Sequence, residues 1–298
     1  MRIDEILNDN RPVFSFEFFP PKTEDGYENL RRTLDQLRHD RPHFVSVTYG
    51  ALGSTRDRTI GIVKYIKQEL GIEAMAHFTC VGATADELKV TLREIDEAGV
   101  DNVLALRGDP PEGQTEWTQT DGGLRYSTDL IELLQESFNF SIGAAAFPEV
   151  HLQAESPEAD IRFLKAKQDA GARFLITQLF YENELYFDFV VRAREAGITV
   201  PIIPGIMPVT NFRQIKRITE MCGAVIPEAF ERELEARSDD ENALADLGVA
   251  YATLQCVDLL SRGAPGIHFY TLNRSPATRA ILAALRAAQP WTRAKQPV

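Results

Sequence analysis

The sequence predicts a single α/β domain folded as a (β/α)8 barrel, and three observations favour this fold class. Short β-rich runs alternate with longer helix-period segments along nearly all of the 298 residues, and this alternation is typical of parallel strand pairing. Eight such strand–helix units can be counted, which suits a barrel of this length. No GxGxxG motif follows an expected strand, which weakens the alternative of a doubly wound open sheet.

The expected strands are short, and each leads into a helix. Strands are expected at residues 13–18, 43–50, 73–80, 102–109, 141–149, 173–180, 200–206 and 266–273. Helices are expected at residues 24–39, 56–70, 127–137, 157–170, 183–196 and 276–288, and two more begin near residues 84 and 211. Thr84 and Glu87 have the spacing of a capping box. Gly99, Gly171 and Gly197 stand where glycine C-caps are expected.

Two segments lie outside this repeat. Residues 1–12 have the pattern of a short amphipathic helix. Residues 223–263, between strands seven and eight, are too long for one helix and are expected to add helices to the barrel. Their acidic stretch is interpreted as a solvated face, with a subunit contact as the alternative. We therefore expect residues 1–298 to form one domain.

The composition limits the classes of function. A hydrophobic content of 44% supports a sizeable core, and a formal charge of −12 argues against a general nucleic-acid binder. Cys80, Cys222 and Cys256 are odd in number and lack metal-type spacing, so we expect reduced thiols. The N-terminus lacks the apolar core of a signal peptide, and no apolar run approaches the length of a membrane span. A cytoplasmic protein is expected.

Polar side chains gather at the ends of the expected strands. In a parallel barrel the carboxyl ends of the strands carry function, so this pattern favours an enzyme over a non-catalytic binding protein. The residues concerned are Glu17, Thr48, His77, Arg107, Gly108, Asp109, Glu149, His151, Gln178, Asn273 and Arg274. No metal site is expected, because His77 and His151 come from different strands and no third ligand has suitable spacing.

Glu17 is the least expected of these residues, because it lies among phenylalanines. Strand alternation places Phe14, Phe16 and Phe18 on one face and Glu17 in the interior, at the carboxyl end. A partly desolvated carboxyl group has a raised pKa, which suits a general acid near neutral pH. The alternative is a buried glutamate paired with Arg107 or His77.

The tripeptide at residues 107–109 and the histidine at position 77 each leave two interpretations open. Arg107 and Asp109 form either an internal ion pair or a ligand site, in which Gly108 lets the backbone approach a ligand closely. His77 is either a satisfied core histidine or a site residue.

Eight motifs follow one another along nearly the whole chain. They are FSFEFFPPK (14–22), FVSVTYGA (44–51), AHFTC (76–80), LALRGDPP (104–111), FPEVH (147–151), DAGARFLITQLF (169–180), IIPGIMPV (202–209) and HFYTLNR (268–274). Together they resemble the bacterial type of methylenetetrahydrofolate reductase. The resemblance implies a (β/α)8 barrel that carries FAD, in which NADH or NADPH reduces the flavin. The flavin then reduces 5,10-methylenetetrahydrofolate to 5-methyltetrahydrofolate, which supplies methyl groups for methionine synthesis.

The resemblance also implies roles for individual residues. Glu17 matches the general acid that protonates the folate nitrogen, and Asp109 matches an aspartate that tunes the flavin and contacts the pterin. Gln178 matches a pterin and nicotinamide contact, while Gln214 and Arg274 match positions that hold the glutamate tail of the folate. The FAD-binding pattern falls on Thr48, Tyr49, Ala51, His77, Arg107, Gly108, Asp109, Ser127, Phe147, His151, Asp160 and Lys167.

Four positions depart from the familiar bacterial pattern. Phe147 stands in place of a tyrosine, so a hydroxyl contact to the flavin is absent while stacking survives. Phe163 and Ala166 replace polar and basic residues near the far end of the dinucleotide. The residues that hold the phosphates of FAD are therefore not all identified. Ile218 replaces an aromatic gating residue.

Two other functions remain as alternatives. The first is the same hydride transfer without a bound flavin, and the second is a non-catalytic folate-binding barrel. The sequence does not choose between NADH and NADPH. A homo-oligomer is expected, as a dimer or a tetramer, with no nucleic acid or membrane as partner.

Overall fold

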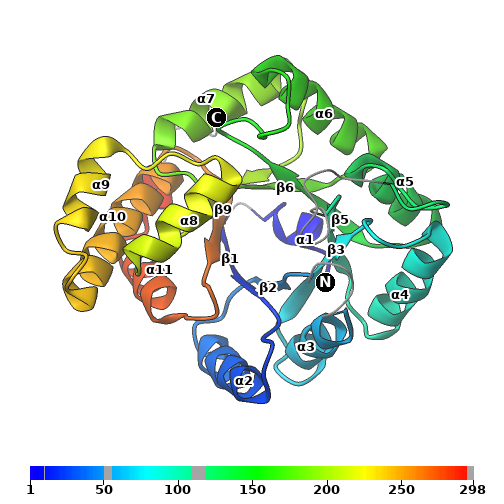
Figure 1. The fold of residues 1–298 in the computed structure, drawn as a ribbon, viewed down its shortest axis with the longest axis horizontal. Coiled ribbons are helices and arrows are strands. Elements are labelled where there is room, and N and C mark those ends of the chain that lie inside the picture. Colours follow the sequence, from blue (N-terminus) through cyan, green and yellow to red (C-terminus); the bar gives the residue numbers. More distant parts are fainter. Residues whose placement is uncertain (10, 50–55, 109–118, 294–298) are drawn as a thin grey trace. The chain divides into compact units, whose positions relative to one another are not determined.

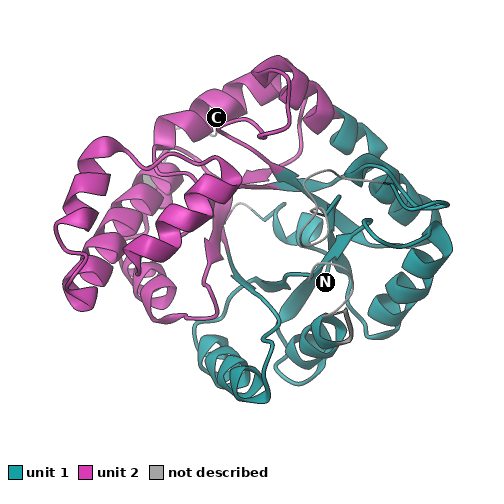
Figure 2. Cartoon of the chain, viewed as in Figure 1, with its two compact units in different colours: residues 1–9, 15–145, 166–175 teal, residues 10–14, 146–165, 176–298 magenta. Residues whose placement is uncertain are grey.

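A computed structural model of the protein describes residues 1–9, 11–49, 56–108 and 119–293. Of the predicted site residues, Ala51 and Asp109 lie outside the described residues. The chain divides into two compact units (Figure 2). Unit 1 comprises residues 1–9, 15–145 and 166–175, and unit 2 comprises residues 10–14, 146–165 and 176–298. The single domain over residues 1–298 stays a prediction.

Strands and helices alternate along the chain (Figure 1). The strands are β1 (Val13–Phe18), β2 (Phe44–Val47), β3 (Glu73–Thr79), β4 (Asn102–Leu106), β5 (Ser141–Ala146), β6 (Phe174–Thr177), β7 (Ile202–Ile203), β8 (Gly205–Ile206) and β9 (Gly266–Tyr270). The helices are α1 (Ile3–Ile6), α2 (Glu24–Arg38), α3 (Arg56–Gln68), α4 (Ala85–Glu97), α5 (Ser127–Ser137), α6 (Pro157–Ala170), α7 (Asn183–Glu195), α8 (Phe212–Cys222), α9 (Glu228–Glu235), α10 (Glu241–Ser261) and α11 (Pro276–Ala288), followed by a 3₁₀ turn at Pro290–Arg293.

The strands form one sheet in the order β7-β6-β5-β4-β3-β2-β1-β9-β8. The pairs β1–β2, β2–β3, β3–β4, β4–β5 and β8–β9 run parallel. β7 and β8 are the two halves of the expected seventh strand, divided at Pro204, which has no N–H to donate to the ladder. The order therefore begins and ends on the same expected strand, and the first strand neighbours the last. This is the strand order of a (β/α)8 barrel, and the predicted fold class is confirmed.

The strands are buried on both faces, as parallel strands generally are. In β1, Phe16 and Phe18 are fully buried on one face, and Ser15 is fully buried on the other. Such a strand tolerates a charged side chain only where a partner is available. Glu17, near its carboxyl end, therefore needs a neighbour that can interact with its carboxyl group.

The predicted helix ends are confirmed. Thr84 Oγ1 accepts a hydrogen bond from the Glu87 N–H at 3.3 Å, and Glu87 Oε2 accepts one from the Thr84 N–H at 2.8 Å, which completes the capping box. Gly99, Gly171 and Gly197 have φ values of 75°, 126° and 78°. These left-handed conformations are those in which glycine ends a helix without steric cost.

Several boundaries differ from the sequence prediction. The first helix covers only Ile3–Ile6 rather than residues 1–12. The extra helices expected within residues 223–263 are present as α9 and α10. The expected strands end early because the chain turns there. After β4, Gly108 adopts a φ of 94°, and after β9 both Leu272 and Asn273 are left-handed. Residues 107–108 and 271–273 therefore belong to loops, and their backbone groups are not part of the hydrogen-bond ladder of the sheet.

Helix α10 differs from the sequence prediction in another respect. By length and composition alone, it is long and apolar enough to cross a membrane, which the sequence analysis did not expect. Within unit 2 it packs against α7, α9 and α11 (Figure 1). Its buried residues include Leu244, Cys256, Leu259 and Leu260. Packing of this kind is typical of a core helix, so its composition is weak support for a membrane span.

Candidate active site

In unit 1, Glu17 and His77 meet at the carboxyl ends of their strands. Glu17 pairs in register with Ser46 of β2, and His77 lies in β3. His77 Nε2 is 3.2 Å from Glu17 Oε2, with the side chains 7% and 17% exposed. This is an ion-pair distance, although Nε2 lacks the alignment of a hydrogen bond. The alternative considered for Glu17, a buried glutamate paired with His77, is therefore present in the structure, and the role of a general acid stays a prediction. The histidine is therefore both a buried residue and a member of the candidate site.

The exit of β2 is fixed by backbone contacts. The Thr48 N–H donates to the Phe18 carbonyl oxygen at 2.8 Å, and the Thr59 hydroxyl donates to the Thr48 carbonyl oxygen at 3.0 Å. The next residue, Tyr49, lies with its ring centroid 5.2 Å from that of Phe78 on β3. Thr48 and Tyr49, which are predicted to contact the cofactor, therefore lie in unit 1 beside the strands that carry Glu17 and His77.

The turn after β4 is tightly packed on β3. The Val81 N–H donates to the Arg107 carbonyl oxygen at 3.1 Å. A Cβ atom on Gly108 would lie 2.5 Å from Val81 Cγ1 and 3.0 Å from Thr79 Cβ. The sequence analysis expected this glycine to let the backbone approach a ligand. The close approach that the structure describes is to Thr79 and Val81, and an approach of this backbone to a ligand stays a prediction.

Cys80 lies in the same turn. Its Sγ donates to the Arg107 carbonyl oxygen at 3.3 Å, and burial raises the pKa of its thiol to about 11. Burial also raises the pKa of Cys222 and of Cys256. All three cysteines are free and at least partly buried, as expected. High pKa values make these thiols poor nucleophiles.

Lys167 and Ser127 complete the described cofactor residues predicted in unit 1. Lys167, on α6, donates from Nζ to the Ala145 carbonyl oxygen near the end of β5, at 2.8 Å. Ser127 is the first residue of α5. The ammonium group of Lys167 is therefore held at a strand end, where the sequence analysis expected a phosphate or ribose contact.

In unit 2, three predicted cofactor residues form one cluster after β5. The rings of Phe147 and His151 pack edge to face, with centroids 4.6 Å apart. The Asp160 carboxylate accepts the His151 N–H at 3.3 Å. Val150 adopts a φ of 71°, which is unusual for a β-branched residue and marks a strained turn. This strain is the kind that functional loops retain.

Besides Glu17 and Asp109, three residues are predicted to contact substrate, and all three lie in unit 2. The Gln178 N–H donates to the Ala146 carbonyl oxygen at 2.8 Å, and its Oε1 accepts the Leu179 N–H at 2.8 Å. Gln214 lies in the first turn of α8, where its N–H donates to Oδ1 of the helix cap Asn211. Arg274 is exposed and follows the left-handed residues 272 and 273.

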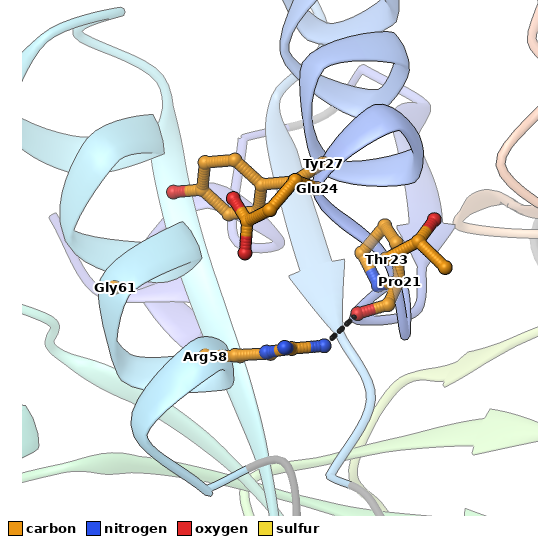
Figure 3. A pocket seen from close by; sticks show the side chains of 6 residues that line it. All are labelled: Pro21, Thr23, Glu24, Tyr27, Arg58 and Gly61. Carbon is orange, nitrogen blue, oxygen red and sulfur yellow. Dashed lines mark hydrogen bonds between the residues drawn. The ribbon is translucent and has the colours of Figure 1, made fainter.

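Two features of the site region were missed by sequence reasoning. Glu149 was noticed at a strand end but received no role, and its contacts are described below. A pocket of about 280 Å³ lies in unit 1 where α2 and α3 begin (Figure 3). At this pocket Arg58 Nη1 donates to the Pro21 carbonyl oxygen at 2.8 Å, which anchors the loop that follows Glu17. Among the residues that the structure describes, no group of three or more His, Cys, Asp or Glu side chains could hold a metal ion.

The strand order and the polar groups at the strand ends define an enzyme of the (β/α)8-barrel class. A family model described as methylenetetrahydrofolate reductase matches residues 2–286. The chain belongs to the methylenetetrahydrofolate reductase family.

Named relatives agree with this assignment. The chain is 44% identical over 268 residues to 5,10-methylenetetrahydrofolate reductase of Escherichia coli (strain K12), which covers 90% of this chain and 88% of the relative. It is 39% identical over 292 residues to a probable methylenetetrahydrofolate reductase (NADH) of Oryza sativa subsp. japonica, covering 94% of this chain and 49% of the relative. The chain therefore spans about half the length of this plant relative.

A solved structure shares the fold. It is an uncharacterized protein from Clostridium thermocellum that is described as binding two copies of 5-methyl-5,6,7,8-tetrahydrofolic acid. The TM-score is 0.67 at 18% identity, and the match covers 97% of this chain and 100% of that chain. At this level of identity the likeness shows the fold alone.

Proposed function

We propose that the protein reduces 5,10-methylenetetrahydrofolate to 5-methyltetrahydrofolate with NADH or NADPH, through a bound FAD. The family and the Escherichia coli relative support this activity. The observation that carries the proposal in this chain is the buried pair of Glu17 and His77, at 3.2 Å. The reduction requires a proton in addition to a hydride, and we assign its donation to the carboxyl group of Glu17, which His77 holds at the end of β1.

Glu17 acts as the general acid. Its carboxyl group donates a proton to the folate nitrogen, the bond between that nitrogen and the bridging carbon breaks, and the five-membered ring opens to an iminium ion. His77 positions the carboxyl group and limits access of water to it. A general acid held in this way contributes about a hundredfold to ten-thousandfold to the rate.

The residues of this chain fit a flavin dinucleotide. A bound FAD would supply the hydride chemistry between the nicotinamide and the bridging carbon of the folate. In unit 1, Arg107 and Lys167 supply cationic donors for phosphate groups, with Thr48 as a neutral donor. In unit 2, Phe147 and His151 supply aromatic surface. We assign the same function to Tyr49, Gly108, Ser127 and Asp160, and to Ala51 and Asp109, which lie outside the described residues.

The charge of the folate tail indicates which residues contact the substrate. The folate tail is anionic, whereas the protein has a formal charge of −12, so a local cation is needed. Exposed Arg274 supplies a planar guanidinium group that suits a carboxylate, and exposed Gln214 supplies an amide. Gln178 is assigned to the pterin and nicotinamide. We further propose a cytoplasmic homo-oligomer whose product supplies methyl groups for methionine synthesis.

One observation favours a second candidate, hydride transfer without flavin. On α6, Phe163 is 61% exposed and Ala166 is also exposed, so neither offers a polar group to a phosphate. A product assay tests the shared activity. NADH oxidation should depend on methylenetetrahydrofolate and yield one 5-methyltetrahydrofolate for each NADH. NADH oxidation without that product would contradict the proposed function, and turnover by protein free of flavin would favour the second candidate.

A further inference from the structure

The loop after β5 is joined to the carboxyl end of α8 at two points, both within unit 2. The Val225 N–H donates to Glu149 Oε2 at 3.0 Å. Gly223, the left-handed C-cap of α8, approaches Leu152 so closely that a Cβ atom would lie 2.6 Å from Leu152 Cδ2. Residues 149–152 and 223–225 are far apart in the sequence, so these contacts fix one loop against the other.

The Glu149 carboxylate is an unusual group for such a link. Its Oε1 is buried and has no hydrogen-bond partner among the described residues. Burial raises the pKa of the Glu149 carboxyl, the hydrogen bond from Val225 lowers it, and the charge of Glu182 raises it further. A buried oxygen without a partner costs free energy. A side chain that costs stability in this way is a candidate for a functional role.

The two joined segments carry side chains assigned above to different ligands. The β5 loop carries Phe147 and His151, assigned to the flavin. Helix α8 carries Gln214, assigned to the folate tail, and Ile218, at the position of the nicotinamide gate. Buried Ile215 anchors α8 in an apolar cluster with Tyr181, Met207 and Phe230. The helix is therefore packed along its length, and its carboxyl end is fixed through Val225.

We propose that Glu149 is a positioning residue that holds the β5 loop against α8, so that the flavin contacts and the folate contacts keep one arrangement. This inference rests on the proposed function. Glu149 touches none of the reacting atoms, and its effect passes through the Val225 N–H. Removing the link should therefore weaken the binding of both ligands while sparing proton transfer from Glu17.

Three substitutions of Glu149 distinguish the effect of side-chain length from the effect of charge. Glu149→Ala removes the acceptor, and Glu149→Asp keeps the charge but is too short to reach the Val225 N–H. Glu149→Gln keeps both the reach and an acceptor oxygen. Glu155→Ala is the matched control, because Glu155 is an exposed glutamate in the same loop.

The first measurement is amide hydrogen exchange over residues 223–226, which does not depend on activity. Exchange should quicken in Glu149→Ala and Glu149→Asp, and stay close to that of the native protein in Glu149→Gln and Glu155→Ala. The second measurement is the Kd for FAD and the KM for the folate. Both should rise about tenfold in the Ala and Asp variants, as expected for the loss of one charged hydrogen bond, with kcat nearly unchanged.

The outcomes are distinct. Unchanged exchange in Glu149→Ala would overturn the link itself. Faster exchange with unchanged Kd and KM would overturn the positioning role. If Glu149→Ala does not fold, Glu149→Asp against Glu149→Gln decides the same question. A native protein that forms no 5-methyltetrahydrofolate would contradict the proposed function and the ligand part of this inference, while the exchange result would still decide whether the link exists.

Discussion

Glu17 lies in an apolar strand and also has a polar neighbour for its carboxyl group. Its strand neighbours Phe16 and Phe18 are fully buried, which removes water from the base of the side chain. His77 Nε2, 3.2 Å away, gives the carboxyl group a polar neighbour. A carboxyl group can donate a proton to a nitrogen, but it takes no part in hydride transfer. Chemistry at this residue is therefore expected to concern proton donation and not the transfer of hydride to the flavin.

The substitution Glu17→Gln tests that role directly. It keeps the shape of the side chain and removes the acidic proton, so we expect folate reduction to slow by about a hundredfold to ten-thousandfold. Flavin reduction by NADH should continue at nearly the native rate. The two half-reactions are followed separately by stopped-flow absorbance without oxygen. Equal loss of both half-reactions in a folded variant would contradict the assignment.

Cys80 offers a second test at this scale. Burial raises its pKa to about 11, against an ordinary value of 9.0. The thiolate fraction rises with pH and reaches half at the pKa, so at about pH 8 it should be about a hundredfold smaller than that of an ordinary thiol. We expect alkylation of Cys80 to be at least that much slower in the native protein than in denaturant, measured by peptide mass spectrometry. Equal rates would show that the turn around Arg107 is open.

At the scale of elements, the exit of β4 depends on a glycine. Gly108 has a φ of 94° and no room for a Cβ atom beside Val81. Gly61, inside α3, has nothing within 4 Å of the same position. We expect Gly108→Ala to lower the free energy of unfolding by about 1–3 kcal/mol. Gly61→Ala should raise it by up to about 1 kcal/mol, because alanine favours a helix.

Urea unfolding of both variants without cofactor measures this difference. A Gly108→Ala protein as stable as the native one would show that the turn relaxes easily. Stabilisation by both substitutions would mean that the packing of residue 108 on β3 does not limit the fold.

Much at this scale follows from local sequence. Strand and helix periods, the Thr84–Glu87 box and the glycine caps are local signals, and they were predicted correctly. The break at Pro204 could have been expected from its missing N–H, but the strand pattern of residues 200–206 concealed it. The early end of β9 depends on left-handed residues 272 and 273, neither of which is glycine. Asn273 is a residue type that adopts this conformation comparatively often, but nothing in the sequence marks Leu272 for it.

Long-range contacts in the site could not be predicted in the same way. The contact of Glu17 with His77 depends on strand register and side-chain direction across the sheet. The contact of Glu149 with Val225 joins residues 76 apart in the sequence. Local periodicity contains no signal for either. The resemblance to a family supplied residue roles, but not these neighbours.

At the scale of the whole molecule, the account predicts that cofactor and fold are coupled. If FAD binds only the native state, about a hundredfold excess over its Kd should raise the free energy of unfolding by about 2.7 kcal/mol. Riboflavin, which lacks the phosphates, should stabilise far less if Arg107 and Lys167 hold those groups. Thermal unfolding with each ligand measures the difference. Equal effects of the two ligands would contradict the phosphate contacts, and no effect of FAD would favour the flavin-free candidate.

The central claim is that one protein carries two half-reactions through a flavin, and the visible spectrum under anaerobic conditions tests it most directly. The purified protein, supplied with FAD, is recorded before and after addition of NADH, and again after methylenetetrahydrofolate. We predict that the flavin band bleaches with NADH and returns with the folate, as 5-methyltetrahydrofolate forms. A band that NADH does not bleach, or that stays bleached when the folate is added, would contradict the account.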